Sequence, residues 1–152
     1  DNELVSAGEG GYGACWGARM NTDVHLLAGW LGFLIGALSG AALGLAFHRE
    51  DWLGGFGSWR RRLLRLGHVA CFGVGFLNVM FAFSAQVRAP AEPWANWASA
   101  GWLVALVTMP LCCVFAAWRQ PLRHLFPIPV AATLVGIGGL LIGWLRVAPT
   151  AN

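Results

Sequence analysis

The chain has 152 residues, of which 57% are apolar and only 11% are charged. Globular proteins carry a charge on about 25% of their residues, and a surface that faces water needs that charge. This composition argues against a soluble enzyme, a disordered chain, a disulfide scaffold and a nucleic-acid-binding domain. All ten basic residues are arginine, and the formal net charge of +3 does not indicate nucleic acid as a partner.

The segment before the first long apolar stretch, residues 1–23, is polar and rich in glycine. It has neither the apolar core nor the small-residue cleavage site of a secretory signal peptide. We therefore expect an outer N-terminal tail, with Met20 as an alternative start of the protein. Cys15 in this tail is expected to be free or to form a bridge to another chain.

Four stretches of the chain lack Asp, Glu, Lys and Arg, and each has at least 22 residues. About 20 residues of helix cross a hydrocarbon core of about 30 Å. Inside lipid the backbone must bond internally, and these stretches lack the strict alternation of barrel strands. The sequence therefore predicts an all-α integral membrane protein. It is a four-transmembrane-helix bundle with spans at about 24–47, 66–87, 97–118 and 127–145, inner loops at 48–65 and 119–126, and an outer tail at 147–152.

The arginines lie mainly in the first and third connections between these spans. Those two connections hold seven arginines, whereas the opposite side has three, Arg19, Arg88 and Arg146. Because short cytoplasmic loops are enriched in basic residues, this bias predicts that both termini lie on the outer, periplasmic side of a bacterial inner membrane.

The first connection also contains an arginine cluster directly before the second span. Ser58 is the expected N-cap of a helix that begins at Trp59 and continues into that span. The cluster is expected to bind anionic lipid headgroups or an inner-side partner subunit. It consists of Arg60, Arg61, Arg62 and Arg65.

Glycine recurs every four residues in the first span, and Ala28 extends this glycine zipper by one step. Such a spacing keeps small residues on one helix face, where they let another backbone approach closely. Another helix of this chain, a helix of another subunit, or a flat cofactor or lipid would fill the resulting groove. The predicted helix-packing residues are Gly32, Gly36, Gly40 and Gly44 in the first span, and Gly67, Gly75, Gly139 and Gly143 in the others.

An ionisable residue inside a membrane is by default a candidate functional residue. The predicted spans contain no Asp, Glu or Arg, which argues against a proton pump, an ion-coupled transporter and a voltage sensor. His68 lies near the inner end of the second span. It shares a helix face with Asn78, which we expect to face protein because its amide needs a hydrogen-bond partner.

His48 and His124 lie at about the same depth as His68, so two of the three imidazoles could ligate one metal centre. Imidazole is a common axial ligand of haem iron, and the candidate cofactors are haem b, a chlorin or a quinone. A carbonyl or lipid headgroup as partner is our expectation for His25, His48 and His124 at the membrane boundaries. His68 is the best candidate ligand, and a hydrogen-bonded packing residue is the expected alternative for it. No fixed-spacing metal motif is present.

Together these features predict a non-catalytic accessory subunit that holds partner helices in a larger membrane complex, an electron-transfer assembly of the respiratory or photosynthetic kind. Its expected partners are membrane lipids and other transmembrane subunits, and no nucleic acid. The alternative is an electron-transfer subunit that binds haem b, a chlorin or a quinone through His68. A small transporter or channel is disfavoured.

Overall fold

The computed structural model describes the backbone of residues 6–147 and the side chains of residues 22–147. The described residues are helical and contain no strand, as the sequence predicts. Four of the described helices are long and apolar enough to cross a membrane, which supports an integral membrane protein. The elements are α1 (Ser6–Ala46), η1 (Trp52–Gly54), α2 (Trp59–Val87), α3 (Trp94–Trp118), η2 (Gln120–Leu125) and α4 (Pro127–Arg146).

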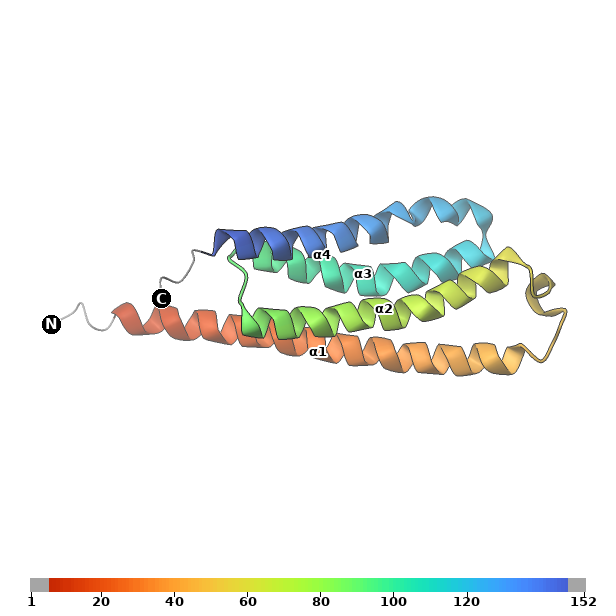
Figure 1. The fold of residues 1–152 in the computed structure, drawn as a ribbon, viewed down its shortest axis with the longest axis horizontal. Coiled ribbons are helices and arrows are strands. Elements are labelled where there is room, and N and C mark those ends of the chain that lie inside the picture. The colour runs from red at the N-terminus through yellow and green to blue at the C-terminus, as the bar shows by residue number, and fades with distance from the viewer. Residues whose placement is uncertain (1–5, 148–152) are drawn as a thin grey trace.

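The four helices run alternately up and down and form an open row (Figure 1). The main contacts join α1 to α2, α2 to α3, and α3 to α4, while α1 reaches α3 over a short stretch only. The row has an η end, which holds η1 and η2, and an α2–α3 end, which holds the loop between those helices. Consequently α1 and α4 are edge helices, each covered by protein along one side.

The first helix is much longer than the others. It begins at Ser6, and its segment 6–21 projects beyond the α2–α3 end of the row (Figure 1). Within the part of the chain whose side chains are described, Thr22–Ala46 is long and apolar enough to cross a membrane. The polar segment expected as an N-terminal tail is therefore helical from Ser6 onward and continuous with the first apolar helix.

The second helix begins where the sequence predicts. The Ser58 side chain accepts a hydrogen bond from the Arg61 backbone N–H at 3.3 Å, which caps the helix start. In the preceding turn Gly54 and Gly55 have φ angles of 87° and 88°. These angles disfavour any residue with a Cβ atom, so the two glycines permit this turn.

Glycines form the contact between α1 and α2. A Cβ atom added to Gly29 would lie 2.5 Å from Val79 Cγ2 and 2.7 Å from the Gly75 carbonyl oxygen. One added to Gly32 would lie 3.2 Å from the Cys71 carbonyl oxygen. Another helix of the same chain therefore fills the predicted groove, and close backbone approach is what the small residues allow.

The other three members of the predicted zipper do not meet backbone atoms of α2. Gly36 and Gly40 face the rings of Phe72 and His68 respectively. Gly44, which we expected to pack, is exposed and has nothing within 4 Å of an added Cβ atom. Within this chain the contact face therefore does not include Gly44, and it extends through Gly29 at its other end.

The other predicted packing glycines lie against neighbouring parts of the same chain. Added Cβ atoms would lie 3.1 Å from Cys113 Cβ at Gly67, 3.0 Å from the Trp94 carbonyl oxygen at Gly139 and 2.6 Å from Pro90 Cβ at Gly143. The tightest backbone contact involves Gly101, where the added atom would lie 2.5 Å from the Gly136 nitrogen. These approaches bring α3 close to both of its neighbours.

Candidate functional site

A buried polar cluster joins α1, α2 and α3. His25 Nδ1 lies 2.7 Å from Asn78 Oδ1, and His25 Nε2 lies 2.8 Å from Ser99 Oγ. The Asn78 amide nitrogen donates to the carbonyl oxygens of Val74 at 2.9 Å and Trp102 at 3.2 Å. His25 and Asn78 are fully buried. Their hydrogen bonds therefore link the three helices inside the protein.

The contacts of Asn78 define the tautomer of His25, that is, which ring nitrogen carries the hydrogen. Because the amide nitrogen donates to two carbonyls, the side-chain oxygen Oδ1 is the atom that faces His25 and can only accept. Nδ1 of His25 must then carry the proton, and in the neutral imidazole Nε2 accepts from the Ser99 hydroxyl. Phe81 covers the ring edge-on, with 4.5 Å between ring centroids. The imidazole is thus satisfied at both nitrogens.

The sequence predicts the position of only one of the two buried residues, Asn78. Asn78 was expected to face protein, and it does. His25 was expected at the outer boundary with a carbonyl or headgroup as partner, and this expectation is wrong because its partners are side chains in the protein interior. Its spacing contained a signal, since His25, Gly29, Gly32 and Gly36 follow one another at intervals of four, three and four residues along one helix face.

His68 lies in the α1–α2 contact, in the half of α2 that is nearer the η end. Its Nδ1 lies 2.8 Å from the Gly36 carbonyl oxygen and 3.4 Å from Ser39 Oγ, and its ring lies over Gly40. Because a carbonyl only accepts, Nδ1 carries the proton and the lone pair is on Nε2. Among the residues whose side chains are described, no hydrogen bond satisfies Nε2.

That arrangement matches the chemistry of a metal-ligating histidine. Such residues usually donate one ring N–H to a carbonyl or carboxylate, which orients the ring and directs the other nitrogen at the metal. His68 is half-buried, and its edge contacts Phe72 with 5.3 Å between centroids. Its Nε2 lone pair could therefore ligate the metal of a haem or chlorin, whereas a quinone carbonyl, which only accepts hydrogen bonds, finds no donor on Nε2.

The other two candidate histidines are not joined to His68. His48 follows α1 and His124 lies in η2, and both side chains are exposed. No three His, Cys, Asp or Glu side chains within the described part of the chain are close enough to hold a metal ion together. A cofactor on His68 would consequently need its second axial ligand from outside this group.

Arg61 differs from its neighbours in the arginine cluster. It is only 1% exposed, and its guanidinium donates to the carbonyl oxygens of Arg49 and Trp52, the latter at 2.6 Å from Nε. The same group lies 4.6 Å from the centre of the Phe56 ring, within cation–π range. The lipid or partner role expected of Arg61 does not fit this position. The cluster members that remain exposed are Arg60, Arg62 and Arg65.

We expect Arg61→Gln to loosen the connection between α1 and α2. Hydrogen bonds to charged groups contribute about 1.5–3 kcal/mol each, and glutamine cannot reach both carbonyls with the planar fork of arginine. Chymotrypsin should cleave the connection at Phe56 at least several-fold faster than in the wild type. Arg60→Gln, whose side chain is exposed, is the matched control. Equal cleavage rates for the two variants would contradict this role of Arg61.

Comparison of the chain with protein-family models, with curated proteins and with solved structures finds no match in any of the three.

Proposed function

We propose that the chain is a non-catalytic transmembrane subunit of a larger complex in a bacterial inner membrane. Its four long apolar helices support insertion. The arginine-rich η end would face the cytoplasm and the α2–α3 end the periplasm, because basic residues favour the cytoplasmic side. Alternation of the helices would then leave both termini outside.

The observation that carries this proposal is the partly uncovered helix α1. Its leucines opposite the glycine face are between 48% and 76% exposed, and they are Leu27, Leu31, Leu34, Leu38 and Leu45. Their spacing of three and four residues, continued through Ala41, is that of a seam onto which a second helix packs.

The projecting segment 6–21 continues from this same helix beyond the row. Most helical stability in proteins comes from tertiary packing, so a neighbouring surface would stabilise this segment. We therefore assign the leucine seam and the projection to a helix of a partner subunit. An electron-transfer assembly, respiratory or photosynthetic, would account for this scaffold role and for an imidazole such as His68.

Purification of the tagged full chain from its native membrane in a mild detergent tests this function. We expect a fixed set of partner chains in constant stoichiometry. Leu31→Ala combined with Leu38→Ala should release these partner chains, because the seam loses two of the leucine side chains that pack against the partner helix. Leu134→Ala with Leu141→Ala on α4 is the matched control, since both leucines are also exposed. A chain that purifies alone, or a release that only the α4 pair produces, would contradict the proposal.

A second candidate function rests on the hydrogen bond from His68 Nδ1 to the Gly36 carbonyl. It leaves the Nε2 lone pair free to ligate the metal of haem b or a chlorin, with a partner subunit supplying any second ligand. When bound, such a group would transfer electrons. The Gly36 carbonyl orients the imidazole of His68, and Gly40, which has no side chain, leaves room for that imidazole ring.

The absorption spectrum of the purified complex, with and without dithionite, tests this second function. If haem is bound, His68→Ala should remove the Soret band, whereas His48→Ala should leave it unchanged because that side chain is exposed and has no contact with His68. A Soret band that survives His68→Ala would exclude His68 as the ligand.

A further inference from the structure

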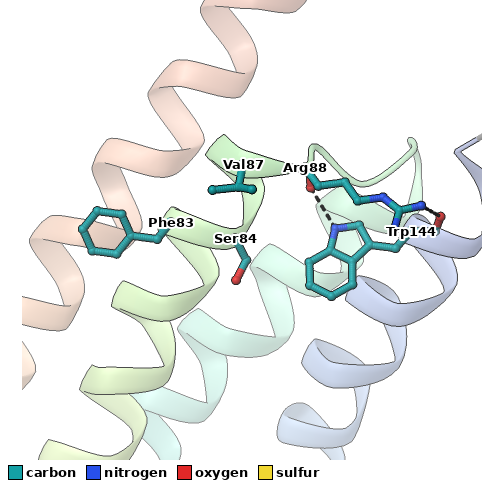
Figure 2. Close-up of a pocket in the computed structure, with 5 residues that line it drawn as sticks. All are labelled: Phe83, Ser84, Val87, Arg88 and Trp144. Atoms are coloured by element: carbon teal, nitrogen blue, oxygen red, sulfur yellow. Dashed lines mark hydrogen bonds between the residues drawn. The ribbon is translucent and has the colours of Figure 1, made fainter. Parts of the chain in front are cut away.

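A pocket of about 350 Å³ opens at the α2–α3 end, between the last turn of α2 and the last turn of α4. Figure 2 shows its five lining residues, with α3 behind them. The pocket exists because α2 and α4 both pack on α3 and have no extensive contact with each other. Its lining residues are Phe83, Ser84, Val87, Arg88 and Trp144.

Two hydrogen bonds across this gap hold Arg88 in place (Figure 2). Trp144 Nε1 donates to the Arg88 carbonyl oxygen at 2.8 Å, and Arg88 Nη2 donates to the Trp144 carbonyl oxygen at 3.0 Å. Both residues thereby become a fixed part of the pocket wall. Only one guanidinium nitrogen is used, so Nε and Nη1 still offer donors, and no carboxylate in the described part of the chain pairs with them.

Apart from the Ser84 hydroxyl, the rest of the lining is apolar and open. Val87 is 89% exposed and Phe83 is 49% exposed, although both are large hydrophobic residues. Trp144 borders the site with an amphipathic ring of the type that prefers a membrane–water interface. The pocket therefore combines a fixed cation with free donors and an apolar wall at one end of the helices.

We propose that this pocket binds an anionic phospholipid, with the phosphate on the Arg88 guanidinium and an acyl chain along Phe83 and Val87. Guanidinium binds phosphate through parallel charge-assisted hydrogen bonds, and the apolar side chains beside Arg88 would contact an acyl chain. Free phosphate would satisfy the cation but leave the apolar wall uncovered. This inference rests on the proposed membrane insertion, which places Arg88 at the interface.

Thermal unfolding of the detergent-purified full chain tests the site. Three probes are compared: phosphatidylglycerol, phosphatidylcholine with the same acyl chains, and inorganic phosphate. At a concentration a hundredfold above Kd, phosphatidylglycerol should raise the Tm of the wild type by about 5–10 °C. Phosphatidylcholine and inorganic phosphate should raise it by less than half as much.

Arg88→Gln should abolish the preference for phosphatidylglycerol, whereas Arg146→Gln should keep it. Arg146 is exposed near the same end of the row but does not line the pocket. Val87→Asp is a second variant, because it leaves the Arg88–Trp144 hydrogen bonds intact and adds a carboxylate at the pocket mouth. It should also remove the preference, even if Arg88→Gln fails to fold.

Three results would overturn the lipid site: equal stabilisation by the two lipids, equal stabilisation by inorganic phosphate, or a preference that survives Val87→Asp. The membrane proposal fails separately, if the chain leaves the membrane fraction on carbonate washing. A chain that stays in that fraction but shows no lipid preference would overturn this inference alone.

Discussion

Gly101→Ala should lower the free energy of unfolding by about 1–3 kcal/mol, the usual cost of overpacking a close contact. A Cβ atom at this position would lie 2.5 Å from the Gly136 nitrogen and 2.7 Å from the Ala132 carbonyl oxygen. Both are backbone atoms of α4, so a change of side-chain rotamer cannot relieve the clash. The two helices must move apart, and the loss is measured by reversible denaturation in mixed micelles.

Gly138→Ala is the control for this experiment, because an added Cβ atom at Gly138 has nothing within 4 Å. Alanine favours the helix over glycine by up to about 1 kcal/mol, so the control variant should be as stable as the wild type or slightly more stable. If Gly101→Ala and Gly138→Ala unfold at the same denaturant concentration, α3 and α4 are not packed as described.

Asn78→Leu should cost about 2–5 kcal/mol of stability, although leucine has nearly the same shape. The change removes the hydrogen bonds that Asn78 makes to His25 and to the Trp102 carbonyl. The His25 N–H is then left buried without an acceptor, and one such unsatisfied group costs about 1–3 kcal/mol. Hydrogen bonds between membrane helices contribute about 0.6–2 kcal/mol more. The same denaturation measurement detects this loss.

A double-mutant cycle separates this network from a general effect of changing Asn78. When His25→Leu and Asn78→Leu are combined, the loss should be clearly smaller than the sum of the two single losses, because neither variant then leaves the other residue unpaired. Asn96→Leu is the control, since Asn96 is exposed and bonds only the exposed Glu92 among the described side chains. Strict additivity would mean that His25 and Asn78 are not coupled.

Two features of the fold, the four long helices and the start of α2, can be predicted from the local sequence. The four helices can be predicted because stretches of 22 or more residues without charge have no other stable form in lipid. The start of α2 can be predicted because the Ser58 hydroxyl satisfies a free N–H of the first turn, which is a local interaction.

The glycine face illustrates what a spacing rule misses. Each four-residue step turns about 40° around a helix of 3.6 residues per turn, so three steps carry Gly44 about 120° from Gly32. Gly29 and His25 lie between Gly32 and Gly40 in helical angle, which is why α2 contacts them and leaves Gly44 uncovered.

Sequence alone determined the class of this protein, the number of its long apolar helices and the residue types that let them pack, because missing charge and helical spacing are properties of each segment by itself. Only the tertiary structure decided that the helices form an open row, that His25 and Arg61 point inward, and that Arg88 borders a pocket with Trp144. Arg60 and Arg61 have the same side chain and adjacent positions, yet one is exposed and the other is buried. Burial depends on how the preceding connection, which holds Arg49, Trp52 and Phe56, folds back over one face of α2, and helical spacing does not specify that path.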